Sequence, residues 1–461
     1  MMHDTGYRIR KLFVRLRLLC ILHLVSIIPV LLFTAVPAEA GLDIKRNVLE
    51  NGLTLLIVER HNLPIVMVSV LIKAGSLNEP EEKAGLASLT AGLLTAGTKK
   101  RTASQISEEG EFVGASLSTS GGIDYVTVAL SVLKKDVLLG FDLLSDVILN
   151  PVFPEKEINK KIKQIKASLK AREDKPGFVA LKAFKKEVFG MHPYGRLASG
   201  RPETLDRIKR ADLIDYHLTY YAPNNAIMSV VGDITPEEVN GLLKEHFSEW
   251  LAREIKIPSF PEIKKNKNRK AVVIDKDLTQ ANIIMGHLGI SRGNPDYYKV
   301  SVMNYILGSG GFASRLMQNI RGEKGLVYDI HSFFAGSKYS GFFKVGLQTK
   351  NESANTAIGE VLKEIKKIRD IPVSETELSD AKAFLTGSFP MRIETSRLIS
   401  SFLVAVEYYG LGMDYIDNYP DYINSVTKED VLNVAKKYLY PEEFILVVVG
   451  NQEKTALKSK W

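Results

Sequence analysis

The chain has 461 residues, of which 45% are hydrophobic and 25% are charged, and its formal net charge is +8. That length and hydrophobic fraction are enough for two or more buried cores. The charge surplus is modest, and no Lys/Arg block carries interleaved aromatic residues, so the composition gives no support for a nucleic-acid partner.

Residues 1–40 have the features of a secretory signal peptide. Five basic residues precede an apolar run from Leu18 to Val36, and a small-residue site follows at Ala38–Ala40. An uncleaved membrane anchor is the alternative, because the apolar run approaches spanning length. Pro29 and the small-residue site favour cleavage, so we expect export across the inner membrane to the periplasm. The signal segment, if uncleaved, would be the only membrane contact.

The single cysteine, Cys20, lies inside that segment. The mature chain would therefore contain no disulfide and perform no thiol chemistry.

The first half, residues 41–252, alternates strand and helix patterns. We expect a hairpin at Asn51-Gly52, whose dipeptide is favoured in two-residue turns, and a capping box that opens a helix at Thr102. The other predicted elements are strands at 65–74, within 117–132 and at 226–231, and helices at 83–98, 102–113, 136–150, 155–172, 178–189 and 212–221.

Residues 253–270 form a predicted linker, because two prolines, few large apolar residues and a Lys/Arg/Asn run make packing there unfavourable. Residues 271–461 then repeat the first pattern. The predicted elements are strands at 271–275 and 282–286, and helices at 297–307, 353–368 and 374–394.

The repeat is clearest near the end of each half. Tyr220–Asp233 parallels Tyr438–Asn451, and Gly232 and Gly450 fall at the same offset of 218 residues. The economical interpretation is an α+β fold of two homologous domains, each an antiparallel-rich sheet with helices packed on it.

The stretch Lys83–Thr98, KAGLASLTAGLLTAGT, follows a predicted strand and an acidic loop. It resembles the active-site helix of the pitrilysin/insulinase superfamily of zinc peptidases, the inverzincins, which reads roughly G-L-A-H-F-L-E-H and ends in G-T. The matching residues are Gly85, Leu86, Ala87, Gly97 and Thr98.

The residues that would perform the chemistry are absent from this stretch. Two His four apart share one helix face and hold zinc, and the Glu beside them is the general base. Those positions fall on Ser88, Gly92 and Ala91, and the family's third ligand, a Glu, falls at Ala167-Ser168. We therefore predict that this chain binds no metal and cannot hydrolyse peptides alone.

The resemblance extends over nearly all of residues 44–452, includes His192-Pro193-Tyr194-Gly195, and implies the two-domain fold. It is greatest to the processing-peptidase-like branch, with its two-subunit zinc proteases. There one chain carries the zinc helix, and a partner without it contributes an Arg and a Tyr from its C-terminal half.

The segment R-G-E-K-G-L-V-Y matches that Arg–Tyr element and places it at Arg321 and Tyr328. A guanidinium suits a peptide carbonyl or carboxylate, and a phenol can donate to an oxyanion. The alternative is a solvated arginine and a half-buried strand tyrosine. Gly310 and Gly311 resemble a substrate-contacting glycine-rich segment of regulatory subunits, although a simple turn that needs positive φ is the alternative.

The histidines of the mature chain form no local metal motif. His331 follows Tyr328 by three residues, so a regular strand would place the two on opposite faces.

Together these features predict a non-catalytic subunit of a heterodimeric zinc metallopeptidase. It would bind peptides and supply Arg321 and Tyr328, while a homologous partner subunit would hold the zinc. One alternative is a structural or peptide-binding module with no part in proteolysis, the use that the respiratory cytochrome b–c complex makes of superfamily members. A self-sufficient zinc peptidase is the third hypothesis.

Overall fold

A computed structural model of the chain describes residues 42–458. The predicted signal peptide therefore lies outside the described residues. From Asp43 onward the described chain forms one compact unit. Within residues 42–458, none of the helices has both the length and the apolar character needed to cross a membrane.

The first sheet has six strands in the order β1-β2-β6-β3-β5-β4. β2 and β6 are parallel, and the other neighbours are antiparallel. The central strand β6 is buried at every residue, which explains its continuous apolar sequence. The strands are β1 (Lys45–Val48), β2 (Thr54–Glu59), β3 (Ile65–Ile72), β4 (Ser116–Gly121), β5 (Val126–Leu133) and β6 (Ala226–Gly232).

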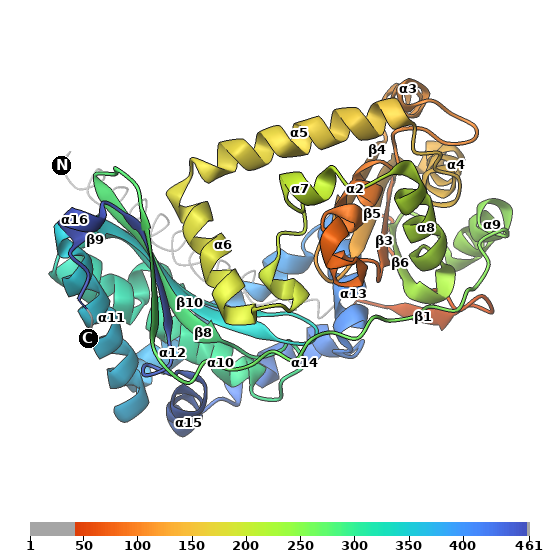
Figure 1. Cartoon of the computed structure of the whole chain (residues 1–461). Helices are drawn as coiled ribbons and strands as arrows, with labels where there is room; N and C mark the ends of the chain where they lie inside the picture. The colour runs from red at the N-terminus through yellow and green to blue at the C-terminus, as the bar shows by residue number, and fades with distance from the viewer. Residues whose placement is uncertain (1–41, 459–461) are drawn as a thin grey trace, which may run out of the picture. The chain divides into compact units, whose positions relative to one another are not determined.

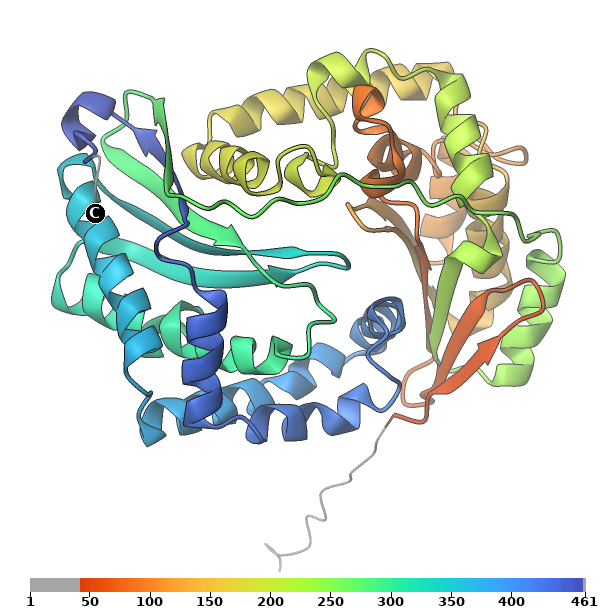
Figure 2. The same cartoon turned by 60° about the horizontal axis from the view of Figure 1, so that its bottom comes forward.

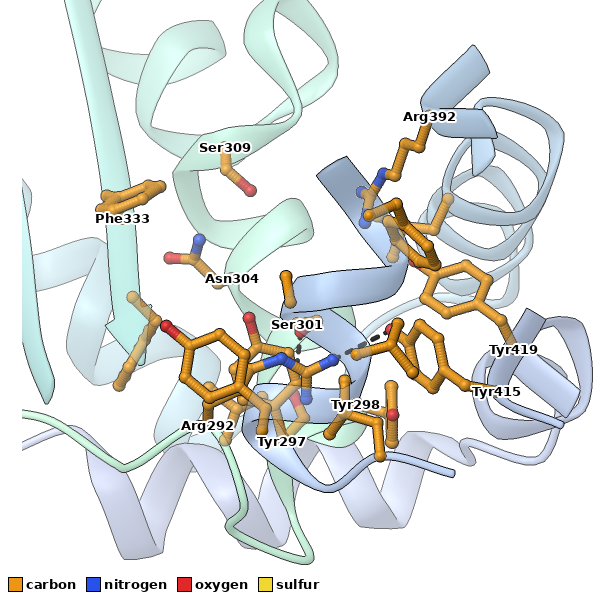
Figure 3. A pocket seen from close by; sticks show the side chains of 18 residues that line it. Arg292, Tyr297, Tyr298, Ser301, Asn304, Ser309, Phe333, Arg392, Tyr415 and Tyr419 are labelled. Atoms are coloured by element: carbon orange, nitrogen blue, oxygen red, sulfur yellow. Dashed lines mark hydrogen bonds between the residues drawn. The ribbon is translucent and has the colours of Figure 1, made fainter. Parts of the chain in front are cut away.

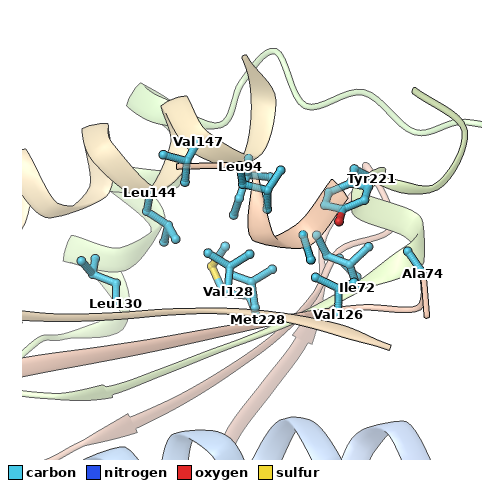
Figure 4. Packing of buried hydrophobic residues seen from close by; sticks show 14 of the residues in the cluster. Ile72, Ala74, Leu94, Val126, Val128, Leu130, Leu144, Val147, Tyr221 and Met228 are labelled. Carbon is cyan, nitrogen blue, oxygen red and sulfur yellow. The ribbon is translucent and has the colours of Figure 1, made fainter. Parts of the chain in front are cut away.

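Helices of the first half cover one face of this sheet. Figure 4 shows Leu144 and Val147 above Val128 and Met228 of the sheet, in a core where all four are fully buried. The predicted capping box of α3 is present, with Thr102 and Gln105 bonded reciprocally. The helices are α2 (Leu86–Gly92), α3 (Ala103–Phe112), α4 (Val137–Leu149), α5 (Glu155–Glu173), α7 (Pro202–Leu205), α8 (Arg210–Tyr220) and α9 (Pro236–His246).

The second sheet repeats the first. Its order is β7-β11-β8-β10-β9, with β7 and β11 parallel. Each of these five strands has a counterpart in the first sheet, whereas β1 of the first sheet has no counterpart in the second. The predicted duplication and the two-sheet α+β fold are therefore confirmed. The strands are β7 (Lys270–Asp275), β8 (Gln280–Leu288), β9 (Val327–Gly336), β10 (Gly341–Lys350) and β11 (Ile445–Gly450).

Helices of the second half cover one face of the second sheet, and α13 reaches the first sheet (Figure 1). Several were not predicted, notably α13, whose apolar face is extensive. The helices are α10 (Tyr297–Asn304), α11 (Ala354–Asp370), α12 (Glu375–Gly387), α13 (Ser396–Tyr409), α14 (Tyr415–Asn424), α15 (Lys428–Tyr438) and α16 (Gln452–Thr455).

Each half sends one helix onto the sheet of the other half (Figures 1 and 2). The first-half helix α6 (Pro176–Phe189) packs on β8 and β11, and α13 packs on β3 and β6. Phe184 meets Phe342 edge-to-face at 5.9 Å, and Ser400 Oγ donates to the Ser229 carbonyl at 3.3 Å. Because the helices are exchanged, the two halves are joined by shared cores as well as by the connecting chain.

Three predicted helices end differently in the structure. The helix expected at 83–98 is regular only over α2, which begins directly after Gly85, at φ +105°, and ends at Gly92. The helix expected at 374–394 ends at Gly387 and continues as a 3₁₀ segment that contains Pro390. The helix expected at 297–307 changes after Asn304 to a π-helix over Tyr305–Ser309.

The predicted linker and hairpin also need correction. Residues 251–268 form no helix or strand, yet Phe260 packs between His192 and Tyr339 at ring distances of 5.6 and 5.5 Å. The linker therefore contributes to a core, because its few apolar residues meet the surface beside α6. The hairpin turn is longer than two residues, since Leu49 and Leu53 bracket it and Gly52 has φ +82°.

Candidate functional site

The position of the missing zinc ligands is filled by packing. Ala91 is fully buried, and a Cβ added at Gly121 of β4 would lie 2.6 Å from the Ser88 Cα. A Cβ added at Gly92 would lie 3.0 Å from Lys161 Cε and 3.5 Å from its Nζ. A cationic side chain thus stands where the second histidine would project.

The third ligand position gives no support for zinc either, because Ala167 and Ser168 lie exposed on α5. Nowhere in residues 42–458 do three His, Cys, Asp or Glu side chains gather closely enough to hold a metal ion. The residues present do not fit zinc, and no chemical step in this chain is assigned to one.

A buried carboxyl group, Glu79, holds the start of the degenerate helix α2. Its two oxygens accept hydrogen bonds from the backbone N–H groups of Gly85 and Ala87, both at 2.8 Å. Burial raises the pKa of Glu79 to about 8, despite the opposing effects of these N–H groups and of Arg196. Glu79 therefore holds the start of α2, although this helix carries no metal-binding side chains.

We expect Glu79→Gln to destabilise the chain by about 1–3 kcal/mol at pH 5, because an amide nitrogen cannot accept from the backbone N–H. The folded pKa of about 8 exceeds the ordinary 4.5, so the contribution of Glu79 is complete below about pH 4.5 and is lost as the pH rises through about 8. Urea unfolding at pH 5, 7 and 9 should show that the difference in the free energy of unfolding between variant and wild type becomes smaller as the pH rises.

The exposed neighbour Glu82 provides a matched control, since Glu82→Gln should leave the free energy of unfolding within about 0.5 kcal/mol. A difference in the free energy of unfolding that stays constant from pH 5 to pH 9 would contradict the expectation, because it would show the Glu79 carboxylate ionised throughout.

The Arg–Tyr element lies at one edge of the second sheet. Arg321 is part of a π-helix, Met317–Glu323, which is followed by Gly325 at φ +60° and then by edge strand β9. The Arg321 guanidinium lies 4.6 Å from the ring centroid of Phe312, which is 74% exposed.

The glycine-rich segment is therefore next to Arg321. Gly311, directly before Phe312, has φ +58°, and an added Cβ there would meet nothing within 4 Å. Gly310 is crowded instead, because an added Cβ would lie 2.8 Å from the Tyr305 carbonyl oxygen. The conformation accounts for both glycines as turn residues and also leaves the Gly311–Phe312 backbone on the surface.

Tyr328 is 83% exposed, because a bulge interrupts β9. Val327 pairs with Thr349 and Ile330 with Leu347, so Tyr328 and Asp329 together oppose one residue of β10. The bulge turns both side chains outward, so buried and exposed residues do not alternate along this part of β9 as they would in a regular strand.

The prediction for His331 is wrong for the same reason. Tyr328, Asp329 and His331 line one cavity of about 250 Å³, between the sheet and the exchanged helix α6. Arg321 and Tyr328 lie on consecutive elements, and no hydrogen bond joins them in residues 42–458.

Three hydrogen-bonding side chains of the neighbouring strands also line this cavity, together with apolar residues. Asn282 comes from β8, and Lys344 and Gln348 come from β10. Burial lowers the pKa of Lys344. These three residues were not predicted, because they belong to no local motif; the polar positions within apolar β10 were the only available signal.

Comparisons with known proteins agree with this architecture. Residues 54–200 match the family described as insulinase (peptidase family M16), and residues 207–385 match the peptidase M16 inactive domain. The uncharacterized zinc protease YmxG of Bacillus subtilis is 24% identical over 410 residues, which cover 88% of this chain and 98% of that protein. The non-peptidase homolog YmxG of Helicobacter pylori is 27% identical over 399 residues, covering 86% and 91%.

Two solved structures share the fold. The peptidase M16 inactive domain from Pseudomonas fluorescens has a TM-score of 0.83 and 26% identity, and the alignment covers 89% of this chain and 98% of that one. A protease from Helicobacter pylori has a TM-score of 0.82 at 21% identity, with coverage of 88% and 99%. The chain therefore belongs to peptidase family M16, the insulinase family, as a member without the zinc-binding His-x-x-Glu-His motif.

Proposed function

We propose that this chain is the non-catalytic subunit of a heterodimeric zinc metallopeptidase, exported to the periplasm. It holds peptide substrates and presents Arg321 and Tyr328 to the active site of a homologous, zinc-bearing partner. The observation that carries the proposal is the 83% exposure of Tyr328 on a scaffold whose own metal position is packed shut. An aromatic side chain so exposed contributes little to folding, and a binding role gives a reason for its position.

In this proposal the chain positions the peptide substrate and stabilises charge on it. The Arg321 guanidinium donates in a planar fork and suits a peptide carbonyl or carboxylate. The Tyr328 hydroxyl can donate to the oxyanion that develops on the scissile carbonyl. Metal and general base both come from the partner subunit, because Ser88, Ala91 and Gly92 supply neither.

An extended peptide could also add to the sheet edge at β4. This strand ends the first sheet, alternates between exposed and partly buried residues, and packs against α2. Its Ser and Thr side chains do not block a further antiparallel strand, and main-chain hydrogen bonds there would bind peptides with little sequence preference.

The test is reconstitution with a homologue from the same organism that carries the intact His-x-x-Glu-His motif. We expect the two chains to co-elute in size-exclusion chromatography and to cleave peptides together, while this chain alone shows no chelator-sensitive cleavage. Chelator-sensitive hydrolysis by this chain alone would overturn the proposal. Co-elution without any gain in cleavage would favour a structural module with no part in proteolysis.

A further inference from the structure

A second cavity, of about 350 Å³, lies within the second half (Figure 3). Its walls come from α10, α12, α13, α14 and β9, and it shares no lining residue with the cavity beside Tyr328. The volume is within the usual range for a small-molecule site.

Arg292, in the loop before α10, lies in the cavity among tyrosine rings (Figure 3). Its Cζ lies 3.9 Å from the Tyr297 ring centroid, and Nη2 donates to the Tyr415 hydroxyl at 2.9 Å. Its other terminal nitrogen, Nη1, is buried and has no hydrogen-bond partner within residues 42–458. A guanidinium stays charged, so its positive charge favours an anion in the cavity beside it.

The charge of the cavity has one sign. Arg392 enters from the short helix after α12, is exposed, and lies 5.7 Å from the ring centroids of Phe389 and Tyr419. None of the lining residues is Asp or Glu. Two arginines without a lining carboxylate favour an anionic ligand over a neutral or cationic one.

Ser301, Asn304 and Ser309 line part of the remaining wall, and most of the rest of it is apolar. Leu385, Phe402, Val406 and Leu411 line it together with the ring of Phe334. A small inorganic anion would leave this wall without contacts, whereas a ligand with an apolar body would cover it.

We propose that this cavity binds an aromatic or aliphatic carboxylate. The carboxylate pairs with the guanidinium groups of Arg292 and Arg392, and the apolar body lies against Phe402 and Leu411. The same chemistry is offered by a free carboxylic acid and by the C-terminal residue of a peptide. This inference stands apart from the proposed peptidase role, because it concerns a different cavity.

The experiment uses the whole mature chain and isothermal titration with four probes. These are N-acetyl-L-phenylalanine, its neutral amide, and a penta-alanyl-phenylalanine peptide with a free or amidated C-terminus. We expect a free carboxylate to bind at least about tenfold more tightly than its amide, because the charge-assisted bond to Arg292 is lost in the amide. Tight binding of the peptide acid would identify a peptide end as the source, and binding of the free acid alone would identify a small metabolite.

Two variants test the assignment by different routes. Arg292→Gln should remove the difference between acid and amide, and Ala405→Phe should abolish both by filling the cavity while Arg292 remains. Arg397→Ala, an exposed arginine on the same helix as Ala405, should bind like the wild type. Equal binding of acid and amide to the wild type, or unchanged binding to Ala405→Phe, would overturn the proposal.

Discussion

Replacing Gly232 with alanine is expected to destabilise the folded chain by more than about 4 kcal/mol, at the severe end for a single substitution. Gly232 ends β6 with φ +145°, and an added Cβ would lie 2.0 Å from the Ile65 carbonyl oxygen. Neither strand can move aside, because Gly232 pairs with Val66 of β3 on one side and with Glu59 of β2 on the other.

The duplicated half provides a matched control for this substitution. Gly450 is the counterpart at the end of β11, but it does not have a positive φ, and an added Cβ would lie 2.8 Å from Asn351 Oδ1 and 3.0 Å from Ala281 Cα. A side-chain amide can yield, so Gly450→Ala should destabilise by about 1–3 kcal/mol. Unfolding in guanidinium should therefore give clearly different free energies of unfolding for the two variants. Equal losses would show that the two strand ends are under the same constraint.

The contrast between Gly232 and Gly450 also shows how much could be predicted from the sequence. The repeat of Tyr220–Asp233 in Tyr438–Asn451 predicted two copies of one fold, because the two terminal strands need the same buried, apolar residues. It could not predict that only one of the two glycines has a backbone conformation that other residues rarely adopt. That difference depends on how closely a neighbouring strand approaches.

The exchange of α6 and α13 lay beyond sequence reasoning for a similar reason. The apolar periodicity of a helix shows that one face is buried, but both sheets offer an apolar surface to receive it. The partner is decided by chain length and geometry across the molecule. From the sequence α6 therefore looked like an ordinary helix of its own half, and α13 was not predicted at all.

At the candidate site, lost chemistry was easier to predict than local geometry. Ala91 and Gly92 have no ligand atoms in any fold, so their loss was evident from the residues. The position of Lys161 beside Gly92, and the bulge that brings His331 to the side of Tyr328, depend on three-dimensional packing. Arg292 gave no signal, because the rings around it come from segments up to about 120 residues away.

In the reconstituted pair, Arg321→Ala is expected to lower kcat/KM for peptide cleavage by about 10²-fold, and Tyr328→Phe by about 10-fold to 10²-fold. Both side chains reach the surface, and Tyr328 is 83% exposed, so neither change should alter the free energy of unfolding appreciably. A loss of activity at unchanged stability would therefore report on catalysis and not on folding.

The division of the effect between kcat and KM distinguishes the two roles. If Arg321 holds substrate carbonyls in the ground state and the transition state alike, Arg321→Ala raises KM with kcat nearly unchanged. If the Tyr328 hydroxyl donates only to the developing oxyanion, Tyr328→Phe lowers kcat with KM nearly unchanged. The matched controls are Arg397→Ala and Tyr339→Phe, whose side chains are also exposed. Wild-type kinetics from both Arg321→Ala and Tyr328→Phe would remove these residues from the mechanism, because a peptide held by the scaffold alone would then suffice for the partner subunit.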